Sequence, residues 1–451
     1  MRLKHIGIIL LLVGGCSSFV AEAQNEKQRE TSALSMHATH SIKRYWFTAD
    51  STTAVLNEFK QRHIQLLAPL KLPVANQALQ ITGIGASGYN SHFLVEHVGS
   101  QWHVYVLRHR PQQPVAPFPY LVQEVVFDTP NPEVSPVGTL TYPAHGGPFP
   151  AVVLVAGTGA HDRDSNISLH KSMLVLADHL TQQGFAVLRY DKRGVGLTGG
   201  AAHPNSTTDD YAADALAALR FLKIQPQVNA TKVGLVGHSE GGVIAAMVAA
   251  QAPSEVAYIA MLVAPGLPGI QLKSLQDASA RRADGMPEEL VQANQQQERE
   301  LFEIAASTLP RDQAIAAMVK ATNALPAQTK TMLDIPPEGI PGEAFEGLLT
   351  PWFRRFLQLD PAKYLHKVRC PVLALLAEKD LQVPATENMA ALVTGLADNH
   401  QAKLLLLPEL NHLLQQAKTG RPHEYLLIEN TLEPTALRQI SGWMQQIVEQ
   451  K

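Results

Sequence analysis

Hydrophobic and polar positions follow two patterns along the chain, and the pattern changes near residue 120. Beyond that point, short continuous apolar runs, typical of buried strands, alternate with stretches whose apolar residues recur at helical spacing. Strands alternating with helices predict a mainly parallel sheet with right-handed crossovers. The predicted strands are LVQEVVFDT, VGTLTYPA, AVVLVAG (151–157), FAVLRYD (185–191), KVGLVG (232–237), VAYIAMLVA (256–264), CPVLALLAEKD (370–380) and AKLLLLPEL (402–410), and the predicted helices are 171–183, 209–223, 241–250 and 434–449.

Residues 267–366 interrupt this alternation. The block is rich in Gln, Glu, Ala and Leu and predicts several helices. Because strands resume after it, we expect an insertion over one end of the sheet, where it can act as a cap. The sheet domain then consists of residues 120–266 and 367–451.

A separate small α+β domain is predicted for residues 50–115. A helix is expected over 53–67, followed by a hairpin of SHFLVEHV and QWHVYVLRH around a turn at 99–100. The proline-rich PQQPVAPFP then predicts an extended linker, and the polar residues 24–49 predict a flexible tether. This region carries no catalytic pattern.

The first 23 residues have the pattern of an export signal. Basic residues precede a short apolar run at 6–13, which is too brief to span a bilayer. Two processing patterns stay open: cleavage after the Ala-Glu-Ala at 21–23, or a lipobox at 13–16 that would leave Cys16 lipidated. We therefore expect an exported protein, periplasmic, secreted or an outer-membrane lipoprotein, that touches a membrane only through such an anchor.

Composition excludes several classes of protein. The chain has 451 residues with 45% hydrophobic and 17% charged residues and a net charge of −3, so a general electrostatic affinity for nucleic acid is not expected. Two cysteines exclude a disulfide scaffold and a cysteine-rich metal cluster. No H-E-x-x-H occurs, and no G-x-G-x-x-G follows a first strand, so we expect neither a metal nor a cofactor.

The strongest chemical signal is Gly-His-Ser-Glu-Gly at 237–241. This G-x-S-x-G directly follows a predicted strand and directly precedes a small-residue helix, which is the context of a nucleophile elbow. Ser239 would project from a sharp turn, and Gly237 and Gly241 would let strand and helix approach closely. His238 is adjacent to the nucleophile and cannot easily fold back as its base, so we expect it to pack or to tune the pocket.

A serine nucleophile needs a base, and the base needs an orienting carboxylate. Asp380 and His412 each follow a predicted strand at its carboxyl end, in the chain order Ser, Asp, His of doubly wound hydrolases. Competing residues lie nearer a strand body, before a strand or in a loop: Glu378, Asp398, His400 and His423.

Acyl transfer also needs donors for an oxyanion. We expect the backbone N–H of Glu240 and a second N–H from Thr158 or Gly159, in the loop after AVVLVAG. The neighbouring HDRD (161–164) predicts a salt-bridged loop, and DKRG (191–194) predicts a structural turn.

Five ordered motifs resemble the α/β-hydrolase superfamily, and more narrowly bacterial serine esterases near the serine aminopeptidases and acyl-thioester hydrolases: PFPAVVLVAGTGAHDRD, VLRYDKRGVGLTGG, KVGLVGHSEGG, CPVLALLAEKDLQVP and LPELNHLLQQAKTG. The resemblance covers roughly residues 120–450. It implies the α/β-hydrolase fold with a helical cap, a triad of Ser239, Asp380 and His412, and hydrolysis of small-molecule esters with short acyl groups.

Two alternatives stay open. The same triad could cleave a peptide as an aminopeptidase, or an acyl-thioester. An aminopeptidase would need carboxylates in the cap to bind a free amine, and the Glu residues of PEEL and QERE occur there. The other alternative is a catalytically silent exported lipoprotein that binds a ligand or a partner.

Overall fold

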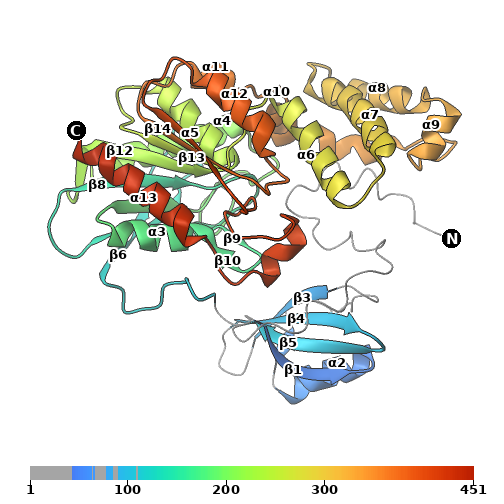
Figure 1. The fold of residues 1–451 in the computed structure, drawn as a ribbon, viewed down its shortest axis with the longest axis horizontal. Coiled ribbons are helices and arrows are strands. Elements are labelled where there is room, and N and C mark those ends of the chain that lie inside the picture. Colours follow the sequence, from blue (N-terminus) through green and yellow to red (C-terminus); the bar gives the residue numbers. More distant parts are fainter. Residues whose placement is uncertain (1–42, 63, 67–77, 85–89, 108–109, 451) are drawn as a thin grey trace. The chain divides into compact units, whose positions relative to one another are not determined.

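The computed structural model describes residues 43–62, 64–66, 78–84, 90–107 and 110–450 (Figure 1). The described residues fall into two compact units that divide between Pro111 and Gln112. The expected export signal and lipobox lie outside the described residues. None of the helices in the described ranges is both long and apolar enough to cross a membrane.

The N-terminal unit is an antiparallel sheet of five strands in the order β1-β5-β4-β3-β2, with one helix, α2. Phe59 of α2 packs edge-on against Phe47 and Phe93 of the sheet, with ring centroids 5.8 and 4.9 Å away. These rings form a small core of their own. The elements are β1 (Lys43–Ala49), α2 (Thr52–Gln61), β2 (Gln65–Leu66), β3 (Ala78–Ile84), β4 (Asn90–Val98) and β5 (Gln101–Leu107).

The expected hairpin is confirmed, because Val98 of β4 pairs with Gln101 of β5 across a two-residue turn. Two other expectations are partly wrong. The end of the tether predicted over 24–49 is β1, which pairs with β5 and buries Phe47 and Ala49. The helix predicted over 53–67 ends at Gln61, because the chain turns there to form β2 against β3.

The second unit is built on a sheet of eight strands in the order β15-β14-β13-β12-β8-β11-β7-β6. The six strands from β15 to β11 are parallel, and β7 and β6 are antiparallel at one edge. The mainly parallel sheet is therefore confirmed. Its strands are β6 (Tyr120–Val126), β7 (Val137–Pro143), β8 (Phe149–Val155), β11 (Ala186–Tyr190), β12 (Val228–His238), β13 (Ile259–Leu262), β14 (Val372–Ala377) and β15 (Ala402–Leu407); β9 (Asn166–Ile167) and β10 (His170–Lys171) form a separate pair.

Helices cover both faces of this sheet (Figure 1). Val153 and Leu235 point into a core beneath one set of helices, whereas Val152 and Val236 point into a core beneath the other. Both faces are therefore apolar, which explains the continuous apolar runs of the strands. The first set includes α4 (Thr208–Lys223), α5 (Glu240–Gln251) and α12 (Ala385–Gly395), and the second consists of α3 (Ser172–Gln182) and α13 (Pro434–Glu449).

The helical block lies between β13 and β14 and has its own core around Phe302, Phe345 and Phe353 (yellow and orange in Figure 1). It is tied to the sheet domain by α10: the Trp352 N–H donates to the carbonyl of Pro204 at 3.0 Å, and Arg355 pairs with Asp209. Its helices are α6 (Gly269–Ala283), α7 (Glu288–Ala306), α8 (Arg311–Asn323), α9 (Ala327–Met332), the 3-10 helix η1 (Gly342–Leu349), α10 (Pro351–Gln358) and α11 (Ala362–Leu365).

Candidate active site

Ser239 is the single residue between the end of β12 and the start of α5, and its backbone is strained. Its φ of 55° and ψ of −124° lie in a region that residues other than glycine rarely adopt. The neighbouring strand holds it there, since the Ser239 N–H donates to the carbonyl of Leu262 at 2.8 Å. This strand–serine–helix turn is the geometry of a nucleophile elbow.

The two glycines of the elbow leave no room for a side chain. A Cβ on Gly237 would lie 2.0 Å from the carbonyl oxygen of Gly241, and one on Gly241 would lie 2.2 Å from that of Val155. The obstacles are backbone atoms, so a substitution would have to move strand against helix. The glycines therefore set the close approach that forms the turn.

We expect Gly237→Ala to lower the free energy of unfolding by about 3 kcal/mol or more, because the added methyl overlaps the backbone of α5. The matched control is Gly442→Ala in α13, where an added Cβ meets nothing within 4 Å. Alanine there should stabilise the protein by up to about 1 kcal/mol through helix propensity. Urea unfolding followed by circular dichroism measures both, and equal effects at the two positions would contradict this account.

A buried carboxylate–imidazole pair lies at the carboxyl ends of β14 and β15. Asp380 Oδ2 is 2.7 Å from His412 Nδ1, and the two residues are 3% and 4% exposed. The other oxygen, Oδ1, accepts the N–H groups of Gln382 and Val383 at 2.7 and 2.8 Å. The carboxylate is thus fixed on both sides, and Nδ1–H donates to it, which leaves the lone pair of a neutral ring on Nε2.

The competing residues are placed elsewhere. Glu378 Oε2 accepts the N–H of Glu409 at 2.9 Å, whereas the partner of His412 Nδ1 is Asp380. Asp398 and His400 are in the turn between α12 and β15, and His423 is in the 3-10 helix η2 (Pro422–Leu427).

His238 joins the elbow to the imidazole pair. Its Nε2–H donates to the carbonyl of His412 at 2.8 Å, and the two ring centroids are 5.0 Å apart. Burial, and then the neighbouring His412, lower the pKa of His238 to about 3, so it is a poor base near neutral pH. His412 is therefore anchored to the residue that precedes Ser239. No hydrogen bond among the described residues joins Ser239 Oγ to His412.

The loop after β8 contacts the elbow. A Cβ on Gly157 would lie 3.1 Å from the Ser239 Cβ. Lys192 Nζ donates to the Gly157 carbonyl at 2.8 Å, and the His161 ring donates to the Thr158 carbonyl at 2.6 Å. Since C=O and N–H point in opposite directions across a trans peptide, the N–H groups of Thr158 and Gly159 point away from these donors.

Comparison with known proteins agrees with this geometry. A model of the family described as serine aminopeptidase, S33 matches residues 151–319, which include the elbow and the loop after β8. With its mainly parallel sheet between two layers of helices, the chain has the α/β-hydrolase fold.

The chain is 26% identical over 310 residues to "Esterase EstD" of Thermotoga maritima, an alignment that covers 68% of this chain and 65% of that relative, slightly less than two thirds of its length. Among solved structures, the Pyrococcus furiosus esterase Pf2001 is 14% identical with a TM-score of 0.43, covering 72% of this chain and 91% of that one. Est1E from Butyrivibrio proteoclasticus is 15% identical with a TM-score of 0.41, covering 72% and 99%.

Sequence reasoning missed the part that two side chains, Lys192 and His161, play in orienting the loop after β8. Burial, and then the charge of Lys192, lower the pKa of His161 to about 4, so it stays neutral near pH 7. A usable signal for Lys192 was its place directly after a buried strand, as for Asp380. Arg163 and Asp164 of HDRD are salt-bridged as expected: Arg163 pairs with Asp191, and Asp164 with Arg189.

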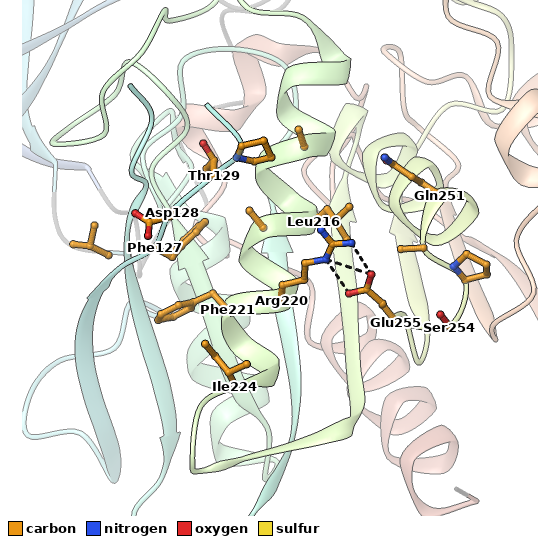
Figure 2. Close-up of a pocket in the computed structure, with 16 residues that line it drawn as sticks. Phe127, Asp128, Thr129, Leu216, Arg220, Phe221, Ile224, Gln251, Ser254 and Glu255 are labelled. Carbon is orange, nitrogen blue, oxygen red and sulfur yellow. Dashed lines mark hydrogen bonds and ion pairs between the residues drawn. The ribbon is translucent and has the colours of Figure 1, made fainter. Parts of the chain in front are cut away.

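The described residues contain no group of three or more His, Cys, Asp or Glu side chains able to hold a metal ion. Figure 2 shows a surface groove between α4 and the segment after α5, lined by Phe221, Ile224 and Ser254 and crossed by the Arg220–Glu255 ion pair. Because α5 starts at Glu240 and ends at Gln251, the groove lies at the opposite end of this helix from Ser239. It is not part of the candidate active site.

Proposed function

We propose that this protein, which has the α/β-hydrolase fold, is a serine esterase that cleaves carboxylic esters through an acyl-enzyme. The observation that carries the proposal is the buried Asp380–His412 pair, anchored through His238 to the strained turn at Ser239. The relative named Esterase EstD supports an ester as the substrate.

In the first step His412 Nε2 takes the proton of Ser239 Oγ as Oγ attacks the ester carbonyl carbon. Asp380 keeps the ring oriented and stabilises the imidazolium that forms. The N–H of Glu240 and that of Thr158 or Gly159 bind the oxyanion of the tetrahedral intermediate. The intermediate collapses as His412 returns the proton to the leaving alcohol, and water activated by His412 then hydrolyses the acyl-enzyme.

We assign the role of cap to the helical block and expect it to limit the acyl group to short chains. Peptide hydrolysis by an aminopeptidase is the second candidate, since the matching family model carries that description. Of the four glutamates in PEEL and QERE, however, Glu298 and Glu288 are already paired, and Glu289 and Glu300 are exposed on the helix surface. Glu298 accepts both terminal nitrogens of Arg281, and Glu288 accepts from Arg282. This pairing favours the esterase.

A substrate panel tests the proposal. We expect p-nitrophenyl acetate and butyrate to be hydrolysed with kcat/KM at least about tenfold above that for acyl-CoA thioesters and aminoacyl p-nitroanilides. For the anilides the reason is that the buried Glu298 is already paired with Arg281 and is not free to bind the substrate amine. Turnover of the anilides alone would establish the aminopeptidase. If no substrate is turned over and a fluorophosphonate probe does not label the protein, the silent binding protein replaces both.

A further inference from the structure

The side chain of Glu240, next to the nucleophile, has no part in the mechanism above, yet it is 3% exposed and forms three hydrogen bonds. Its Oε1 accepts Thr208 Oγ1–H at 2.6 Å and Trp352 Nε1–H at 2.9 Å. Its Oε2 accepts Thr158 Oγ1–H at 3.1 Å. A buried carboxylate is costly unless donors satisfy it, so these contacts are what allows Glu240 to lie there.

The three donors come from three separate parts of the fold. Thr158 is in the loop after β8, Thr208 opens α4, and Trp352 is in α10 of the helical block. The carboxylate therefore joins the loop, the sheet domain and the block at one point, directly beside Ser239.

Trp352 is held on its other sides as well. Its ring meets that of His203 edge-on, with centroids 4.6 Å apart, and stacks on Phe356 at 5.1 Å. Its backbone N–H donates to Pro204. These contacts surround the indole, whose Nε1–H points at Glu240.

We propose that Glu240 is a positioning residue: its carboxylate fixes the relative positions of the two backbone N–H groups expected to bind the oxyanion. Because the carboxylate also accepts the Trp352 Nε1–H, those positions depend on Trp352 of the helical block. The inference rests on the proposed esterase function. Its physical basis is that the Thr158–Glu240 side-chain bond joins Glu240 to the Thr158–Gly159 segment, and an N–H of that segment is expected to bind the same oxyanion as the N–H of Glu240. A shift of about 1 Å in such a donor can lower turnover about 100-fold.

Two substitutions of Glu240 distinguish the contribution of its hydrogen bonds from that of its packing. Glu240→Met keeps the length of the side chain and loses all three bonds, so we expect kcat for p-nitrophenyl butyrate to fall about 30- to 100-fold, with KM within about threefold of wild type. Glu240→Gln should keep at least about a third of wild-type kcat. Its amide oxygen can accept from Thr208 and Trp352, and its NH₂ can donate to Thr158 Oγ1.

Trp352→Phe tests the contribution of the helical block. It removes the Nε1–H donor and keeps an aromatic ring, and we expect kcat to fall about three- to tenfold. The matched control is Trp443→Phe, since Trp443 is also a packed indole, 6% exposed and 6.0 Å from the ring of Tyr258, but lies in α13 on the other face of the sheet. We expect its kcat to stay within about twofold of wild type.

Thermal melting and stoichiometric fluorophosphonate labelling show that each variant is folded with a reactive Ser239. If Glu240→Met does not fold, Thr208→Val and Trp352→Phe decide, since each removes one donor only. The inference is overturned if the folded donor variants keep wild-type kcat, or if Glu240→Gln is as impaired as Glu240→Met. A wild-type protein that neither hydrolyses esters nor takes the label would overturn the esterase itself, which is a different result from an active wild type with an equally active Glu240→Met.

Discussion

Replacing Ser239 with alanine is expected to lower kcat for p-nitrophenyl butyrate by about 10⁴-fold or more. The hydroxyl oxygen is the atom proposed to form the acyl-enzyme, and no neighbouring group can replace it in that step. The oxyanion donors and the substrate contacts remain, so the variant should still bind esters and keep a small residual rate above that in water. Initial rates with purified protein measure the loss, and a fluorophosphonate probe should no longer label the chain.

Ser254→Ala is the matched control. Ser254 is exposed beyond the end of α5, in the groove of Figure 2, and its replacement should leave both rate and labelling unchanged. Alanine at position 239 keeps the strained backbone, since it has a Cβ as serine does. The melting temperature should therefore change little. Continued turnover by the Ser239→Ala protein would rule out the proposed nucleophile.

Asp380→Asn is expected to lower kcat by about 10⁴-fold. Oδ1 of Asp380 accepts two backbone N–H groups, from Gln382 and Val383, so the single amide oxygen of asparagine should stay on that side. Its NH₂ group would then face His412 Nδ1, which must act as an acceptor. The proton of the neutral ring would move to Nε2, where it blocks removal of the Ser239 proton.

The control is Glu378→Gln, two residues earlier on the same strand end. The Glu378 carboxylate accepts the Glu409 N–H, a bond that the glutamine oxygen can keep, so kcat should remain within about twofold of wild type. The pH dependence of kcat/KM gives a second readout. In Asp380→Asn the His412 ring is held in the wrong tautomer and must rotate or exchange its proton before it can act as a base, so the pH profile should differ from that of the wild type. Similar losses in the two variants would mean that Asp380 does not act through His412.

The predictions that agree best with the structure rest on local pattern. The closing helix predicted over 434–449 is α13, and the elbow at Ser239 lies between a strand and a helix as its flanking residues indicated. Boundaries that depend on partners are less accurate. The strand predicted over 256–264 is shorter, β13 covering Ile259–Leu262, because Val263 has a φ of 46° and turns out of the strand. The strand β1 was missed because its pairing with β5 involves residues more than fifty positions away.

The sequence alone determined the mainly parallel sheet, the helical block within it and the chain order of Ser239, Asp380 and His412. Apolar periodicity and the residues that end each strand are properties of neighbouring positions, so they can be read without a partner. Only the tertiary structure decided which groups meet: that His238 holds His412 by its carbonyl, that Lys192 and His161 orient the loop after β8, and that Glu240 bonds Trp352, 112 residues away. A hydrogen bond depends on distance and direction between atoms, and for residues far apart in the chain both are set by how helices and strands pack.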